Sequence, residues 1–192
     1  MLIIIEGVDC SGKTTLINEM MRRAHNAFHI RRSDVPKSAE KTEVSRLKRS
    51  YKVIKEIYCR VIKPNQGHLV VERFYPSELV YSGIKRGYEA FEDKFYSCFE
   101  KELLESLGDD IVVIHVFQEA KIIKERLKFR GDDYVTEEEV GKLSMRYIDF
   151  LNWTQLNAYS IPGNNTGIES AINYINSLCN NDFDKNSIHK KI

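Results

Sequence analysis

The sequence has few of the features that mark membrane, disulfide-rich and metal-binding proteins. Its four cysteines are scattered over 192 residues, with neither metal-ligand spacing nor the density of a small disulfide framework, so we expect reduced thiols and a cytoplasmic protein. No apolar run approaches the length that spans a membrane, and the apolar first residues are too few for a signal peptide. The 29 basic and 28 acidic residues nearly cancel, which argues against a dedicated nucleic-acid binder.

The most informative stretch lies at the start of the chain. Leu2–Ile5 is a short β-branched run that predicts a strand buried on both faces, and Leu16–Met21 has an apolar helical pattern. Between them, Gly7-x-x-x-x-Gly12-Lys13-Thr14 is the phosphate-binding pattern in the strand–loop–helix context that it requires. The residues that we expect to bind ATP are Gly7, Val8, Asp9, Cys10, Ser11, Gly12, Lys13, Thr14 and Thr15.

The residue types of this loop suit a polyphosphate. Successive backbone N–H groups supply many donors in a small space, the glycines permit conformations that a side chain forbids, and the following helix points its positive end at the anion. Lys13 would reach the β- and γ-phosphates, and the Thr14 hydroxyl would bind Mg²⁺, directly or through water together with Glu72. We expect no buried structural role for Lys13.

Strands and helices alternate along the rest of the chain, which shows no internal repeat. Further strands are predicted at 28–30, 69–71, 111–117 and 156–161, and further helices at about 40–62, 88–107, 120–128 and 168–178. Another helix is predicted to begin at the capping box Thr136–Glu139 and to carry its apolar face over 140–151. The alternation predicts an α/β protein with a three-layer P-loop NTPase fold, in which a mostly parallel five-stranded sheet carries helices on both faces. Residues 1–179 would form this single domain, and the polar residues 180–192 would form a frayed tail.

Two of these elements carry polar residues that could have either a structural or a functional role. The helix over 40–62 has an apolar stripe, formed by Val44, Leu47, Tyr51, Ile54, Tyr58 and Val61. Its basic residues fit a solvated face, with the alternative that one or two of them, such as Arg49, point into a phosphate cleft. His115 lies inside the strand at 111–117, where a lone histidine is more often a core residue than a catalyst.

Two polar segments follow predicted elements elsewhere. Glu72 and Arg73 come directly after the buried strand at 69–71, at the end of a parallel strand where ligands bind. A charged pair there must be solvated by something in the cleft, so we favour a binding role over a surface ion pair. Residues 126–134 combine three cations with a glycine and two acids between two late helices. These segments and the phosphate loop would meet above the carboxyl edge of the sheet.

Together these segments resemble the thymidylate kinase family of P-loop nucleoside monophosphate kinases. The matching residues are Ile5–Thr15, with an aspartate two positions after the first glycine, Glu72-Arg73-Phe74 with Ser77 and Tyr81, and the lid-like Arg126–Tyr134. The resemblance covers most of the chain, and its first motif is highly specific to P-loop proteins. It implies ATP as phosphoryl donor, Mg²⁺ as cofactor, small-molecule nucleotides as ligands and a homodimer.

The resemblance also implies a role for each matched residue of the acceptor site. Asp9 would hold the 3′-hydroxyl of the acceptor sugar near the metal, and Arg73 would contact the acceptor phosphate. Tyr81 would pack where a ribose 2′-hydroxyl needs room, which favours deoxyribose, and Tyr134 would cover the acceptor.

The lid would supply the catalytic charge. It would span about 126–136, and its Arg126 and Arg130 would bind the transferring phosphoryl group. Cys10 stands where some family members have a catalytic arginine, so this chain would rely on the lid.

Two departures from the family pattern keep alternatives open. Where the family usually has an aspartate, this chain has Glu72. The resulting Glu-Arg pair also resembles the deoxynucleoside kinases, although those enzymes typically carry small or apolar residues where Asp9 stands. Residues 31–36 match only loosely the family's Arg-Glu-Pro stretch. We therefore predict ATP-dependent phosphorylation of a pyrimidine deoxynucleoside monophosphate, above all dTMP, with a modified pyrimidine or a purine left open. The alternatives are a deoxynucleoside kinase and a non-catalytic ATP-binding protein.

Overall fold

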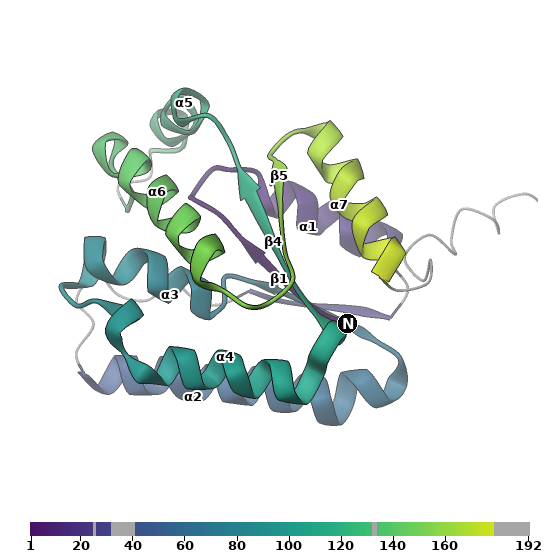
Figure 1. Cartoon of the computed structure of the whole chain (residues 1–192). Helices are drawn as coiled ribbons and strands as arrows, with labels where there is room; N and C mark the ends of the chain where they lie inside the picture. Colours follow the sequence, from purple (N-terminus) through teal and green to yellow (C-terminus); the bar gives the residue numbers. More distant parts are fainter. Residues whose placement is uncertain (25, 32–40, 132–133, 179–192) are drawn as a thin grey trace, which may run out of the picture.

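A parallel five-stranded sheet forms the centre of the protein (Figure 1). The computed structural model describes residues 1–24, 26–31, 41–131 and 134–178, with side chains from residue 44 in the second helix. The strand order is β2-β3-β1-β4-β5, and every neighbouring pair is parallel. The strands are β1 Leu2–Glu6, β2 Ala27–Arg31, β3 His68–Glu72, β4 Ile111–Phe117 and β5 Ala158–Pro162. All five predicted strands are therefore confirmed.

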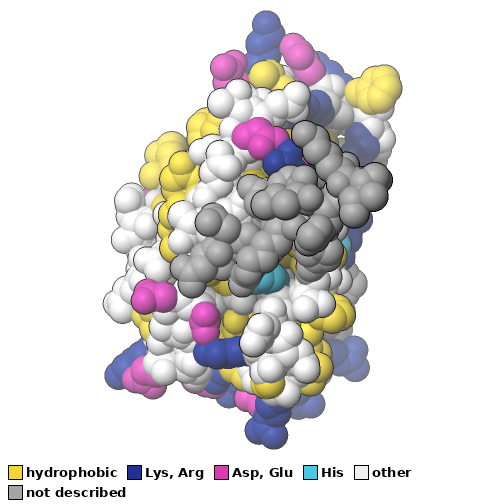
Figure 2. Space-filling model, turned by 90° about the vertical axis from the view of Figure 1, so that its right-hand side faces the viewer, with side chains coloured by type: hydrophobic (Ala, Val, Ile, Leu, Met, Phe, Trp, Pro, Cys, Tyr) yellow, Lys and Arg dark blue, Asp and Glu magenta, His cyan; other side chains and the backbone are white. Residues whose placement is uncertain are grey.

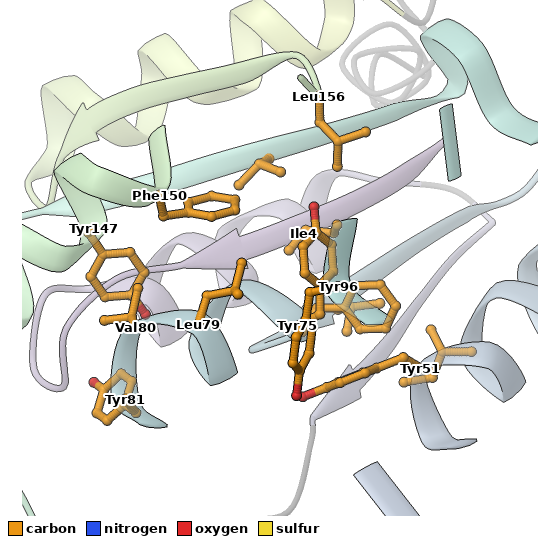
Figure 3. Close-up of a cluster of buried hydrophobic side chains, with 14 of the residues drawn as sticks. Ile4, Tyr51, Tyr75, Leu79, Val80, Tyr81, Tyr96, Tyr147, Phe150 and Leu156 are labelled. Atoms are coloured by element: carbon orange, nitrogen blue, oxygen red, sulfur yellow. The ribbon is translucent and has the colours of Figure 1, made fainter. Parts of the chain in front are cut away.

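Helices cover both faces of the sheet. They are α1 Lys13–Arg23, α2 Lys41–Ile57, α3 Tyr75–Tyr81, α4 Lys94–Leu107, α5 Ala120–Arg130, α6 Glu137–Trp153 and α7 Asn165–Leu178. Alternate residues of β1 separate two cores, because Ile3 and Ile5 pack towards α1 and α7 while Leu2 and Ile4 pack towards α2–α6. Figure 3 shows the core that contains Ile4, where labelled side chains of α3, such as Leu79 and Val80, lie near Tyr147 and Phe150 of α6. The predicted three-layer α/β fold is confirmed.

Two predicted helices differ in detail from the structure. Tyr51, Ile54 and Tyr58 are buried as expected, but Val61 is 55% exposed and Ile62 is 6% exposed. The cause is a π-helical turn at Tyr58–Ile62, which has more residues per turn, so the buried position comes one residue later.

The helix predicted over 88–107 begins only at Lys94, after a 3₁₀ turn at Ala90–Glu92. It begins there because the Asp93 carboxylate accepts the backbone N–H of Phe95 at 2.9 Å as an N-cap.

The charged side chains on the described surface are of both signs, as the nearly equal numbers of basic and acidic residues lead us to expect. Acidic and basic side chains are interspersed on the face shown in Figure 2 rather than gathered by sign. Among the described residues, no helix is both long enough and apolar enough to cross a membrane. The tail predicted at 180–192 and most of the loosely matching segment 31–36 lie outside the described residues.

A buried carboxylate fixes the end of the central strand. Glu6 is fully buried, and its Oε1 accepts the backbone N–H groups of Phe74 at 2.6 Å and Ser77 at 3.3 Å. Its Oε2 accepts the hydroxyl groups of Ser77 at 2.6 Å and Tyr147 at 3.1 Å. Burial raises the pKa of Glu6, although these donors and Arg73 favour the charged form. The carboxylate thus joins β1 to the start of α3 and to α6.

This arrangement predicts different effects for two substitutions of Glu6. Glu6→Ala should lower the free energy of unfolding by about 3 kcal/mol, because it leaves buried donors without an acceptor. Glu6→Gln should cost about 1 kcal/mol or less, because an amide oxygen still accepts both N–H groups and the hydroxyls rotate to accept its NH₂. Tyr147 also has the Gly7 carbonyl as an acceptor at 3.1 Å. Urea unfolding measures both values, and equal losses would contradict this account.

Candidate active site

The phosphate loop, residues 7–14, combines left-handed backbone conformations with close packing. Gly7, Cys10 and Gly12 have φ values of 148°, 63° and 112°. A Cβ atom on Gly7 would lie 2.2 Å from the backbone oxygen of Val116, so only glycine fits between the loop and β4. The loop leads directly into α1, whose first residue is Lys13.

Lys13 lies inside this loop rather than beyond it. Its side chain is buried, and Nζ donates to the carbonyl oxygens of Gly7 and Val8, both at 2.9 Å. The expectation that Lys13 has no buried role was therefore wrong, because the loop curls around the ammonium and uses it as an internal donor. Burial and the nearby Arg73 guanidinium lower the pKa of Lys13 to about 7.

Asp9 and Arg73, which are 64 residues apart, form an ion pair at the loop. The Tyr81 hydroxyl also donates to Asp9, at 3.2 Å, and the Arg73 guanidinium lies 5.1 Å from the centre of the Tyr81 ring. Burial alone would raise the pKa of Asp9, but the positive charges of Arg73 and Lys13 outweigh it and lower the pKa. The structure thus brings together three residues that the sequence placed in one site.

Tyr134, which belongs to the segment predicted as a lid, extends this cluster; residues 132 and 133 of that segment lie outside the described residues. Its ring is stacked on that of Tyr81, with centroids 6.2 Å apart and an interplanar angle of 20°. Nζ of Lys85 lies 5.4 Å from the Tyr134 ring centre and forms an ion pair with Glu139. Glu139 belongs to the predicted capping box of α6, which is confirmed by its bond to the Thr136 N–H at 2.8 Å. Lys85 was missed, since nothing in its local pattern indicates this contact.

Glu72 and Thr14 offer oxygen atoms that suit a hard cation. The Thr14 hydroxyl donates to Oε1 of the buried Glu72 at 3.4 Å. Oε2 of Glu72 is buried and has no hydrogen-bond partner among the described residues, although Arg31 and His29 lie 3.7 and 3.8 Å from it. Because this oxygen accepts no hydrogen bond among the described residues and only long ion pairs reach it, it fits Mg²⁺ binding. No group of three or more His, Cys, Asp or Glu suited to a metal occurs among the described residues, so phosphate and water oxygens would complete the shell.

Among the described contacts of the arginines predicted on helices, one reaches the phosphate loop. The Arg126 guanidinium on α5 donates to the Cys10 carbonyl at 2.9 Å. Arg130 is exposed at the end of the same helix, which stops at Gly131 with a φ of 65°. Arg49 is exposed on α2. Arg126 is therefore the arginine that the geometry associates with the loop.

A polar cavity of about 480 Å³ adjoins the outer side of the phosphate loop. Its lining includes Gly12, Thr15, Arg126 and the loop at 163–166 between β5 and α7. A Cβ atom on Gly163 would lie 1.7 Å from the backbone carbonyl oxygen of Ser11, so the backbone of this loop packs directly against the backbone of the phosphate loop. The sequence alone does not indicate this packing, because a contact between residues so far apart leaves no local pattern.

Comparisons with known proteins identify the fold. No protein-family model matches the chain. The sequence is 24% identical over 169 residues to the SPbeta prophage-derived uncharacterized protein YorR of Bacillus subtilis (strain 168), covering 83% of this chain and 87% of that protein.

Three solved structures share this architecture. YorR of Bacillus subtilis, in complex with phosphorylated GDP, has a TM-score of 0.66 at 20% identity and covers 93% of this chain and 96% of that chain. Thymidylate kinase from Candida albicans has a TM-score of 0.63 at 15% identity and covers 94% of this chain and 92% of that chain. Deoxyadenosine kinase from M. mycoides has a TM-score of 0.54 at 18% identity and covers 93% of this chain and 100% of that chain. The chain therefore has the fold of P-loop nucleotide kinases.

The lowered pKa of Lys13 predicts proton uptake when a polyphosphate binds. At pH 8 an amine with a pKa of about 7 is mostly neutral, and contact with phosphate raises that pKa. Binding of ATP should therefore take up about one proton at pH 8 and much less at pH 6. Calorimetric titrations in buffers of different ionisation enthalpy measure this number. Lys13→Met should abolish the uptake, and Lys94→Met, an exposed control on α4, should keep it.

The same shift makes stability depend on pH. Because the folded-state pKa lies below the usual 10.5, the unfolded chain binds more protons between pH 7 and 10.5, and the contribution of Lys13 to stability rises with pH across that window. In the calorimetric titration with ATP, proton uptake that persists in Lys13→Met would show that another group takes up the proton.

Proposed function

We propose that the protein transfers the γ-phosphoryl group of ATP to a pyrimidine deoxynucleoside monophosphate, with dTMP as the leading acceptor. The observation that carries this proposal is the Asp9–Arg73–Tyr81 cluster beside the phosphate loop. A protein that only binds ATP has no use for a buried cation and carboxylate next to the loop, whereas an acceptor phosphate and sugar hydroxyl need such partners.

The donor side of the site would hold ATP. Loop amides and Lys13 would bind its β- and γ-phosphates, and the cavity bounded by Arg126 and residues 163–166 would take the rest of the nucleotide. Thr14 and Glu72 would hold Mg²⁺, which when bound neutralises charge on the phosphate oxygens. The phosphoryl transition state leaves little covalent chemistry for the protein, so positioning and charge dominate.

The acceptor side would use the other face of the same loop. Arg73 would exchange part of its contact with Asp9 for the acceptor phosphate, and Asp9 would accept the sugar hydroxyl. The Tyr81 ring, held by Asp9 and stacked on Tyr134, would close the space beside C2′ of the sugar. The predicted homodimer and cytoplasmic location stay predictions.

A deoxynucleoside kinase is the second candidate, and Glu72 favours it. The buried Oε2 of Glu72 has no hydrogen-bond partner among the described residues and would suit a base that accepts a proton from a nucleoside hydroxyl. The fold agrees with either candidate, since it is shared with thymidylate and deoxyadenosine kinases.

A panel of acceptors tests the proposal. The protein is incubated with ATP and Mg²⁺ and with each of dTMP, dUMP, dCMP, dAMP, dGMP and GMP, and separately with the corresponding nucleosides. We expect turnover of monophosphates, led by dTMP, and no turnover of nucleosides. Guanine nucleotides are included because the YorR structure holds phosphorylated GDP. Turnover of nucleosides alone would establish the second candidate, and ATP binding without any turnover would indicate a non-catalytic protein.

Tyr81 should set the preference for deoxyribose. Tyr81→Ala should reduce the ratio of kcat/KM for dTMP over its ribonucleotide, because it opens space beside C2′. Tyr81→Phe is the matched control, since it keeps the ring and its stacking on Tyr134 but loses the bond to Asp9. If the ring is the determinant, Phe should retain the ratio. A ratio that moves equally in both variants would assign the preference to the hydroxyl instead.

Arg126 should supply charge to the moving phosphoryl group. Arg126→Ala should lower the single-turnover rate by about 10³, the magnitude of arginine fingers. ATP affinity should change far less, because the contact strengthens in the transition state. Lys121→Ala, an exposed cation on the same helix, is the control. A rate within a few-fold of wild type would direct the search to Arg130, whose substitution is tested in parallel.

A further inference from the structure

A second cavity, of about 280 Å³, lies behind the phosphate loop. It is enclosed by the loop, by the ends of β4 and β5, and by α5 and α6 on the side of the sheet opposite α1 and α7 (Figure 1). Its lining includes Val8, Ser11, His115, Phe117, Ile123 and Ile148. The proposed chemistry uses none of this space, since the donor cavity lies beside Gly12 and Arg126.

The lining selects the kind of molecule that this cavity would hold. None of the described residues that line it is Asp, Glu, Lys or Arg, and aliphatic and aromatic side chains form most of its wall. Burial and the nearby Lys13 lower the pKa of His115 to about 4, so the imidazole is neutral at pH 7. A phosphate or any other ion would lose its hydration without gaining a counter-charge there. The cavity therefore excludes nucleotides and suits an uncharged molecule.

Polar atoms at the inner end of the cavity indicate that its occupant carries a hydrogen-bonding group. The Ser11 hydroxyl is buried and has no hydrogen-bond partner among the described residues. In the same lining, Nδ1 of His115 lies 3.1 Å from the Ser160 hydroxyl, and the imidazole ring is stacked on Tyr147 at 5.0 Å. A buried hydroxyl without a partner is costly, so a ligand group that pairs with Ser11 would be favoured.

The opposite end of the cavity reaches solvent. Phe117 and Ile148 are 47% and 46% exposed, although both are large apolar residues. An occupant that covers them would bury apolar surface, which adds to the binding free energy.

From these observations we propose that the cavity is a binding site for a small uncharged molecule with an apolar body, about the size of a substituted benzene, and one hydrogen-bonding group. Such a ligand would contact Val8 and Ser11 from behind, while the Val8 carbonyl accepts the Lys13 ammonium on the other side. The ligand and a nucleotide would therefore occupy separate spaces on the two sides of the loop.

The test uses 4-fluorophenol as the probe, fluorobenzene as its apolar partner and ¹⁹F NMR of the full chain. Both should bind at millimolar concentration, and the phenol should bind about fivefold more tightly because of its hydroxyl. Ser11→Ala should remove that preference. Saturating ATP with Mg²⁺ should leave the probe bound. The measurement needs no turnover, so its outcome is independent of the proposed kinase activity.

Two variants on α6 locate the probe. Ile148→Trp should fill the mouth and weaken binding at least about tenfold, whereas Met145→Trp, at a 58% exposed position outside the cavity, should leave it unchanged. Ser144→Leu fills the cavity from its wall and replaces the first variant if thermal melting shows that Ile148→Trp is unfolded. Absence of binding, displacement by ATP, or full binding in the filled variants would each overturn the proposal.

Discussion

The buried carboxylate of Glu6 is the contact on which the geometry of the site depends. The start of α3 has backbone N–H groups with no partner inside the helix, and Glu6 accepts two of them from the end of β1. The same side chain accepts the hydroxyl of Tyr147, which also lies within hydrogen-bond distance of the Gly7 carbonyl. One carboxylate therefore sets the relative positions of the phosphate loop, the start of α3 and α6.

The conformation of Arg73 follows from that constraint. Its φ of 61° lies in the left-handed region, which costs a residue with a side chain about 1–2 kcal/mol. The neighbours enforce it, because the Arg73 N–H donates to the Ile5 carbonyl at 3.1 Å and the next N–H donates to Glu6. The turn brings the guanidinium back over the phosphate loop, where it meets Asp9 and the Tyr81 ring. Strain in the backbone is thus offset by an ion pair at the place where an acceptor phosphate would bind.

Local pattern predicted most of the fold and only part of the site. The strand–loop–helix unit, the five strands and the capping box depend on neighbouring residues, so periodicity and motif spacing were sufficient. The residues next to Glu6 and Lys85 in the sequence indicate no role for either side chain. Their partners, Ser77, Tyr147 and Tyr134, come from elements that only the tertiary structure brings near. The buried position of Lys13 was missed for the same reason, since the curvature of the loop decides which carbonyls face the ammonium.

Charge compensation explains how this site would bind a polyphosphate reversibly. Lys13 has two carbonyl partners and Arg73 has Asp9, so neither cation depends on a ligand for its stability. A phosphate would replace these partners rather than neutralise an isolated charge, and the net gain in free energy would be smaller than the strength of its contacts. The lowered pKa of Lys13 adds to this effect, because part of the binding energy goes into protonating the amine. The proposed phosphoryl transfer requires release of the product, and partners that compete with phosphate would make that release easier.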